Sequence, residues 1–429
     1  MTKASVAGLF VLACVWLLHA CGGGGGGSAA PPQADPQAAL AATIRTDSRL
    51  AAVRAKAKQL VAASLTAGTG YPAVFIRDLN TFIDLAIEAQ GAAAIRPQLE
   101  LFLAHQGADG NIPDGIEIAT GNSFKGTVET DQESSLVQAV AKYVAASGDT
   151  AFLSQQIGGV AVMTRLENAL AFLYAQRYSA QYGLVWGGTR ADWGDVQPED
   201  VPGTNLSALS HPSISIYDNA MLTLALVDLQ TLERAAARDA SAWAAKESSL
   251  RAAIRANLWT GTQFAPHIYL DKGSPFPASF DESKMYFQGG TAVAIQAGLL
   301  QPAEVTQAFA RMVKNKVDSG SGSVGVSLYP PYPAGFFANT EYMGSQYYYQ
   351  NGGDWPWFGA RIIQQMVVAG QAQTAYDELG TMLDRVLRDN GFYEWYTQGG
   401  QARGSADYRG TAGQLAKAID MLEAWAAAH

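Results

Sequence analysis

The chain has 429 residues, a net charge of −9 and only 16% charged residues. Because an acidic chain repels the phosphates of nucleic acid, we exclude nucleic acid as a partner. The two cysteines, Cys14 and Cys21, both lie near the N-terminus, so the rest of the chain has no disulfide and depends on its hydrophobic core.

An export signal opens the chain. The apolar run VAGLFVLACVWLLHA ends at Ala20 and is followed by Cys21, a run of glycines and SAAPPQADPQ. Because the run is shorter than the roughly 20 residues of a membrane-spanning helix, we expect residues 1–20 to be a cleaved signal peptide. The segment LHAC resembles the lipobox of bacterial lipoproteins, which implies lipidation of Cys21. Residues 21–38 are then a flexible tether, and the lipid would hold the exported protein on the periplasmic or cell-surface side of a bacterial membrane.

Helical periodicity dominates the rest of the chain, and few segments alternate as strands do. The pattern predicts twelve helices. They span residues 40–66, 77–90, 93–106, 131–147, 158–178, 213–234, 240–257, 287–298, 303–315, 354–369, 372–389 and 411–427.

The links between these helices alternate in length. Short links, such as GAA and GQAQ, follow the second and the tenth helix, whereas the links that enter the even-numbered helices are long and rich in Gly, Trp, Tyr, Asp and Pro. Short links make antiparallel helical hairpins. Because the even-numbered helices are also the more apolar, we predict an all-α (α/α)6 toroid over residues 39–429, with these helices inside and the long loops around one pocket. An open superhelix would repeat a motif at a fixed period, and no such repeat is present.

Unusual polar and aromatic motifs occur just before the even-numbered helices. FIRD precedes the second helix, ETDQE the fourth, ADWGD the sixth, QNGGDWPW opens the tenth and GFYEWY precedes the last. Any one aspartate among them, such as Asp78, Asp131 or Asp354, could be only a helix N-cap. Five such motifs on one face of the toroid favour a binding site.

These motifs resemble those of the six-hairpin glycoside hydrolases. FIRD is similar to the Arg-Asp pair with which glucoamylase-like enzymes and neutral invertases hold sugar hydroxyls, and QNGGDWPW is similar to a segment of neutral invertases and cellobiose phosphorylases. GFYEWY resembles the motif that carries the catalytic base of glucoamylase, trehalase and neutral invertase. ADWGD resembles the Asp-Trp of rhamnosidases and phosphorylases, in which the aspartate is the general acid. The resemblance implies cleavage of a glycosidic bond, with Asp192 as general acid and Glu394 as general base.

The residue types agree with that chemistry. Cleavage with inversion needs one protonated carboxylic acid at the leaving oxygen and a second carboxylate that activates water, about 6.5–9.5 Å away. The apolar Trp193 would raise the pKa of Asp192 and keep it protonated, so we prefer Asp192 to Asp195 as the acid. Glu394 is preferred to Glu341 as the base.

We expect polar side chains and aromatic faces to hold the sugar. The candidates are Arg77, Asp78, Asp131, Gln132, Asn351 and Asp354, with Trp193, Trp355, Trp357 and Trp395 for stacking. No histidine pair has the spacing of metal ligands on a helix, so we expect neither a metal nor another cofactor. His211, just before the sixth helix, could line the pocket or have a structural role.

The sequence therefore predicts a monomeric, exo-acting, inverting glycoside hydrolase that removes a terminal, α-linked sugar from oligosaccharides or glycosides. Three alternatives stay open. A phosphorylase would replace the base by phosphate, which the presence of Glu394 argues against. A polysaccharide lyase would need a Tyr or His base, and a glycan-binding lipoprotein would need the aromatic residues but not the acid pair.

Overall fold

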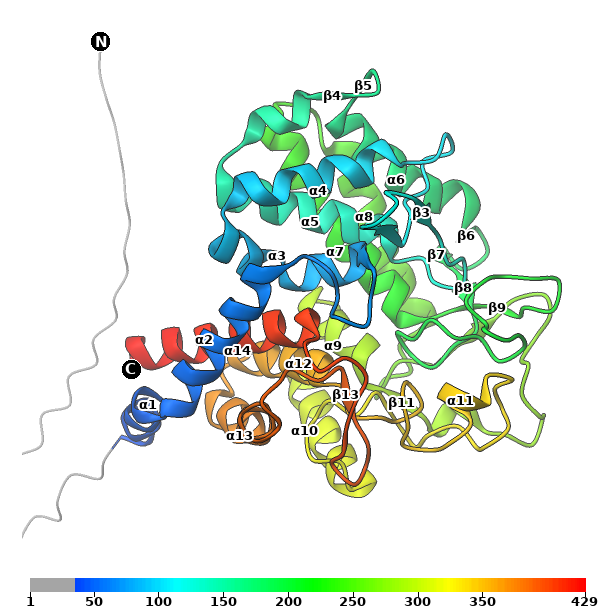
Figure 1. Ribbon diagram of the computed structural model, residues 1–429. Helices are drawn as coiled ribbons and strands as arrows, with labels where there is room; N and C mark the ends of the chain where they lie inside the picture. Colours follow the sequence, from blue (N-terminus) through cyan, green and yellow to red (C-terminus); the bar gives the residue numbers. More distant parts are fainter. Residues whose placement is uncertain (1–34) are drawn as a thin grey trace, which may run out of the picture.

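The structure, a computed structural model, describes residues 35–429. The predicted signal peptide, Cys21 and most of the predicted tether lie outside the described residues. Within them, helices are joined by loops that carry very short strands (Figure 1). No helix in this part of the chain is long and apolar enough to cross a membrane.

The twelve predicted helices are all present. The α-helices are α1 (Pro36–Thr46), α2 (Ser48–Ala63), α3 (Ile76–Gln90), α4 (Ala92–Ala104), α5 (Gln132–Ser147), α6 (Val162–Gln176), α7 (Ile216–Ala235), α8 (Ser241–Asn257), α9 (Gln288–Gln296), α10 (Pro302–Ser319), α11 (Thr340–Met343), α12 (Pro356–Val368), α13 (Ala372–Asp389) and α14 (Arg409–Ala428).

Three features of the helices differ from the prediction. The first predicted helix is broken at Asp47, whose side chain accepts a hydrogen bond from the backbone N–H of Arg49 and caps α2. Helix α1 begins at Pro36, inside the segment predicted as tether, and buries Leu40 and Ile44. The short helix α11 is additional and lies in the long loop before α12.

The inner helices close a ring. Helix α3 packs against α5, α5 against α7, α7 against α9, α9 against α12, α12 against α14, and α14 back against α3. These are the even-numbered helices of the prediction. Their first turns are buried on every side, as in α9, where residues 288–295 are all buried. A helix that is buried all round belongs to the core, so the closed ring is the inner wall of an (α/α)6 toroid.

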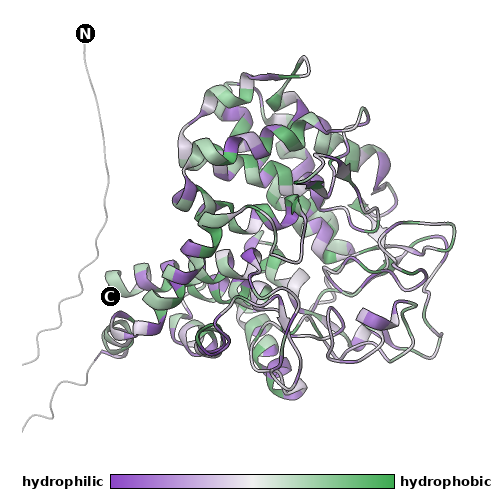
Figure 2. Cartoon of the chain, in the orientation of Figure 1, coloured by the Kyte–Doolittle hydropathy of each residue, from purple (hydrophilic) through white to green (hydrophobic). Residues whose placement is uncertain are grey.

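The outer helices cover this ring. Helix α2 packs on α3 and α14, α4 and α6 flank α5, α8 packs on α7, α10 on α9 and α13 on α12. Apolar residues of α13 face inward at Leu379, Met382, Leu383 and Val386, while Asp377, Asp384 and Arg388 are exposed. Figure 2 shows the same division as apolar and polar stripes along the helices.

The long loops that enter the inner helices carry the short strands, except for the β4–β5 ribbon, which lies in the link from α5 to α6. The strands are β1 (Ala73–Phe75), β2 (Gly115–Glu117), β3 (Ser123–Phe124), β4 (Gln156–Ile157), β5 (Val160–Ala161), β6 (Tyr178–Ser179), β7 (Leu184–Val185), β8 (Gly187–Gly188), β9 (Pro212–Ile214), β10 (Ile268–Tyr269), β11 (Tyr286–Phe287), β12 (Leu328–Tyr329), β13 (Trp395–Tyr396) and β14 (Ala402–Arg403). All paired strands are antiparallel, with sheet orders β1-β2-β3 and β10-β9-β8 and four two-stranded ribbons. Because β1, β9 and β11 run directly into α3, α7 and α9, the sheets fix how the chain enters the inner ring.

Candidate active site

A pocket lies where the long loops meet the N-terminal ends of the inner helices. It contains about 440 Å³ of empty space, part of it open to solvent. Its walls come from segments far apart in the sequence, as the toroid predicts. The lining residues are Ala67, Tyr71, Phe75, Arg77, Asp78, Trp193, Asp195, Tyr349, Gln350, Trp355, Trp357, Glu394 and Tyr408.

Glu394 lies in this pocket and is only 5% exposed. Burial raises the pKa of Glu394 to about 7, and the charges of Asp78 and Asp195 add to the rise, while hydrogen bonds from the Tyr71 hydroxyl and the Ser405 N–H oppose it. The Ser405 N–H lies 3.2 Å from Oε2 of Glu394. A carboxyl group with a pKa near 7 can give up or take a proton at neutral pH, as acid–base catalysis requires.

Asp195 also lines the pocket, and it is the most exposed of the acids there. Its side chain is 29% exposed, and its Oδ2 lies 3.8 Å from Nη2 of Arg77. The side-chain amide of Gln350 fixes the loop here, because its Nε2 donates to Oδ1 of Asp195 at 2.8 Å and its Oε1 accepts from the Asp195 N–H at 3.3 Å. Asp195 is thus held facing the pocket by a residue of the loop that precedes α12.

Asp192, which the sequence favoured as the acid, does not line the pocket. Its side chain is fully buried, and its two carboxylate oxygens accept hydrogen bonds from the backbone N–H groups of Gly289 and Gly290, at 2.7 and 2.9 Å. Burial raises the pKa of Asp192 to about 8, while these two donors favour the charged form. Of the two aspartates, Asp192 therefore binds the first turn of α9, and Asp195 is the one that lines the pocket.

Glycines make this arrangement possible. A Cβ atom at Gly289 would collide with the ring of Trp193, and one at Gly290 would lie 2.8 Å from Oδ1 of Asp192. Asp192 itself has a positive φ of 53°, a backbone conformation that aspartate tolerates better than most residues. The tight contact with α9 therefore sets the direction in which the chain continues to Asp195.

Arg77 lies beside a group of buried acids. Its Nη1 is 3.6 Å from Glu129 and 3.9 Å from Asp131, and its Nη2 is near Asp195. Burial raises the pKa values of Glu129 and Asp131, and the positive charge of Arg77 opposes the rise in both. Asp78 follows Arg77 in the chain and accepts a 2.6 Å hydrogen bond from the Tyr408 hydroxyl.

Aromatic rings form one wall of the pocket. Trp193 meets Trp355 edge to face with ring centres 4.7 Å apart, and Trp357 at 5.1 Å. These three rings line the pocket but are at most 2% exposed. Trp395 stacks behind Trp355 with centres 6.4 Å apart and is not among the lining residues. The tryptophans thus form a rigid apolar wall, and Trp395 supports it.

Several predicted binding residues bond to other parts of the protein and do not line this pocket. Asp131 accepts from the Tyr217 hydroxyl at 2.8 Å, and Gln132 donates to Glu129 at 3.4 Å. Asn351 pairs with the backbone of Tyr332, and Asp354 binds Arg385 at 2.7 Å and the N–H of Ser323 at 3.0 Å. None of these four lines the pocket. They hold the loops around it.

The two remaining candidates lie elsewhere as well. Glu341, the rival for the base, is exposed on α11. Nδ1 of His211 lies 2.6 Å from a carboxylate oxygen of Glu199, so this histidine has a structural partner.

Sequence reasoning missed several lining residues. They are Tyr71, Phe75, Tyr349, Gln350 and Tyr408. Gln350 opens the motif QNGGDWPW and Tyr408 comes directly before α14, so their positions before inner helices were a usable signal. Tyr71 lies just before FIRD in the long loop that enters α3, and Phe75 is the first residue of that motif, so the same reasoning applies to them.

Comparisons with known proteins identify the architecture. No family model matches the chain, and no curated protein matches it. Among solved structures, a GH63 mannosylglycerate hydrolase from Thermus thermophilus is similar with a TM-score of 0.62 and 16% identity, over 85% of this chain and 99% of that one. A GH78 rhamnosidase of Bacillus sp. GL1 has a TM-score of 0.60 and 16% identity, over 86% of this chain and 34% of the larger chain. A rhamnosidase from Klebsiella oxytoca with rhamnose bound has a TM-score of 0.58 and 14% identity, over 86% and 63%. The chain has the (α/α)6 toroid fold of these six-hairpin glycoside hydrolases.

Proposed function

We propose that the protein is an exo-acting glycoside hydrolase that removes a terminal sugar, α-linked, from oligosaccharides or glycosides with inversion. The observation that carries this proposal is the placement of Asp195 and Glu394 in one pocket, beside Arg77 and Asp78 and against a tryptophan wall. Two carboxyl groups in a sugar-sized pocket are what glycoside hydrolysis requires. Because the 440 Å³ of empty space includes part of the open mouth, the enclosed part of the pocket is small, which favours exo action on a chain end.

In this proposal Asp195 donates the proton and Glu394 activates water. Asp195 is held at the solvent-exposed part of the pocket, where a leaving group departs, and Gln350 fixes its orientation. Glu394 has a pKa of about 7, so much of it is ionised at neutral pH and can take a proton from water. Asp78 and Arg77 remain as partners for the hydroxyls of the bound sugar.

The test is a sugar-release screen of the purified protein on di- and oligosaccharides and aryl glycosides. We expect Asp195→Asn and Glu394→Gln to lose several orders of magnitude in kcat on natural substrates. Asp192→Asn is the matched control in the same loop, and it should keep far more activity per folded molecule than Asp195→Asn. If Asp192→Asn abolishes turnover and Asp195→Asn does not, the assignment of the acid is wrong.

The two roles can be separated with an aryl glycoside whose leaving group needs no protonation. Asp195→Asn should then recover most of its activity, whereas Glu394→Gln should not, because water must still be activated. NMR of the first product gives the anomer and tests inversion. Glycan binding without turnover by the wild type would favour a binding protein, and activity only with added phosphate would favour a phosphorylase.

The location of the protein is part of the proposal. The lipobox-like LHAC supports lipidation at Cys21 and anchoring outside the cytoplasm, where oligosaccharides from the surroundings are available. Labelling of cells with a fatty acid should mark the wild type and not Cys21→Ser. An unlabelled wild type would contradict this proposal without affecting the activity.

A further inference from the structure

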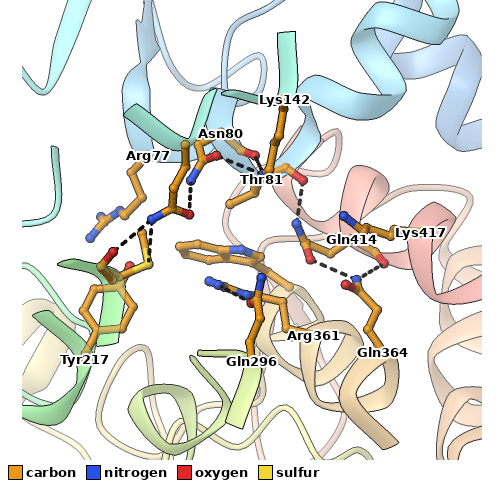
Figure 3. A pocket seen from close by; sticks show the side chains of 13 residues that line it. Arg77, Asn80, Thr81, Lys142, Tyr217, Gln296, Arg361, Gln364, Gln414 and Lys417 are labelled. Carbon is orange, nitrogen blue, oxygen red and sulfur yellow. Dashed lines mark hydrogen bonds between the residues drawn. The ribbon is translucent and has the colours of Figure 1, made fainter. Parts of the chain in front are cut away.

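A second cavity lies on the axis of the toroid, lined by all six inner helices (Figure 3). It contains about 390 Å³ of empty space, part of it open to solvent. Its lining is polar and contains basic and amide side chains. The residues are Arg77, Asn80, Thr81, Gln138, Lys142, Tyr217, Met221, Gln296, Trp357, Arg361, Gln364, Gln414 and Lys417.

Four cationic side chains line this cavity, and none of the described lining residues is an acid. Two of the cations have their own carboxylates: Arg77 lies within 4.0 Å of three acids, and Lys417 lies 3.0 Å from Asp84. Within residues 35–429, Arg361 and Lys142 have no acid within 4.0 Å. The excess charge of the cavity is therefore positive.

Arg361 carries the argument furthest. It is 7% exposed, and its one hydrogen bond to the described part of the chain runs from Nη2 to Oε1 of Gln296 at 2.9 Å. A guanidinium group has five N–H donors, so most of them face the cavity without a protein acceptor. Burial lowers the pKa of Arg361, and the nearby Asp131 and Tyr217 oppose this only in part.

Lys142 faces the same space from the opposite side of the ring (Figure 3). Its Nζ donates to the side-chain oxygen of Asn80 at 2.9 Å and also to the Asn80 carbonyl oxygen. Burial and the charges of Lys417 and Arg361 lower the pKa of Lys142 to about 8, although Asp84 and Asp228 act in the other direction. Two buried cations that repel each other across a polar cavity are unfavourable unless an anion lies between them.

We propose that the axial cavity binds one small inorganic anion of the size of chloride, held by Arg361 and Lys142. The site lies behind Trp357 and Arg77, which line both this cavity and the pocket that contains Glu394. The anion would neutralise the positive charge at the centre of the ring and thereby stabilise the fold. The proposal concerns binding and stability and is independent of the proposed glycoside hydrolase activity.

The test is thermal unfolding of the purified protein in chloride at constant ionic strength, with methanesulfonate as the replacing anion. The melting temperature of the wild type should rise with chloride by about 1–3 °C for each tenfold increase above the dissociation constant. Equilibrium dialysis with labelled chloride should find one bound ion per chain. Equal melting temperatures in the two salts, together with no bound chloride, would overturn the proposal.

Variants locate the site. Arg361→Gln and Lys142→Met should each abolish the chloride-dependent rise, and Arg388→Gln, which removes an exposed arginine of α13, should keep it. Two cavity variants are used because one of them could fail to fold. If Arg361 has only a structural role, Arg361→Gln should lower the melting temperature by the same amount in both salts. If Arg361 binds the anion, the melting temperature should fall further in chloride. A chloride effect that persists in both cavity variants would place the ion elsewhere and contradict the proposal.

Discussion

The Tyr71 hydroxyl opposes the rise that burial causes in the pKa of Glu394, so its removal should shift the pH dependence of activity. The Tyr71 hydroxyl donates to the Glu394 carboxylate and so favours the ionised form of a buried acid whose pKa is about 7. A hydrogen bond to a charged group contributes about 1.5–3 kcal/mol, and one pKa unit corresponds to about 1.4 kcal/mol. Tyr71→Phe should therefore raise the pKa of Glu394 by about one unit or more.

The assay is kcat/KM against pH for the substrate found in the screen. A base must be ionised, so the wild type should gain about tenfold in kcat/KM between about pH 6 and about pH 8, with its midpoint at the pKa of Glu394. In Tyr71→Phe this rise should move to higher pH. Tyr408→Phe is the matched control, because its hydroxyl donates to Asp78 instead. Asp78 then ionises less readily and repels Glu394 less, so the midpoint should fall or stay in place.

Two results would refute this reasoning. Activity that falls as pH rises through about 7 would show that Glu394 acts as the acid, since it must then be protonated to react. A rise whose midpoint is the same in the wild type and in Tyr71→Phe would show that the hydroxyl does not act on the catalytic carboxylate.

Three further predictions concern stability. The pKa of Glu394 in the folded protein exceeds its ordinary value of 4.5, so ionisation of Glu394 costs stability as pH rises from about 4.5 through about 7. Urea unfolding should therefore find Glu394→Gln more stable than the wild type by up to about 3 kcal/mol at pH 8, with no gain at pH 4. Asp192→Ala leaves two N–H groups of α9 without acceptors and should cost about 2–4 kcal/mol by the same measurement, whereas an unchanged stability would remove Asp192 from that role. Gly289→Ala should cost about 1–3 kcal/mol and lower kcat by moving Trp193 and the following Asp195, and a variant with wild-type kcat would show that this loop adapts.

The fold could be predicted because its signals are local and repeated. Helical periodicity marked every helix of the ring, and the alternation of short and long links indicated which helices lie inside. The break at Asp47 was missed because the apolar pattern continues through it, and only the cap geometry shows that the chain starts a new helix there.

The pocket could be predicted only in part. Arg77 and Asp78 line it from the first turn of α3, and Glu394 lines it from the long loop that enters α14, where the loops converge. The choice between Asp192 and Asp195 could not be made from the sequence, because it depends on two glycines that are 97 and 98 positions away. Asn351 and Asp354 were predicted to bind the sugar but do not line the pocket. Polar residues that organise a loop beside a pocket are of the same types as residues that bind a ligand, so the sequence does not separate them.

The distribution of charge connects the two cavities of the ring. Acids are in excess in the pocket, where burial and the charges of Asp78 and Asp195 raise the pKa of Glu394. Cations are in excess on the axis, where Arg361 and Lys142 have no acid of residues 35–429 within 4.0 Å. Arg77 lies at the boundary and is matched by its own carboxylates, so it adds little net positive charge to either side. If the axial cations faced the pocket, they would stabilise the ionised form of Glu394 and lower its pKa. Because the cations lie on the axis and the acids in the pocket, the pKa of Glu394 stays raised, as acid–base chemistry at neutral pH requires. The same separation leaves a positively charged axial cavity that an anion can neutralise.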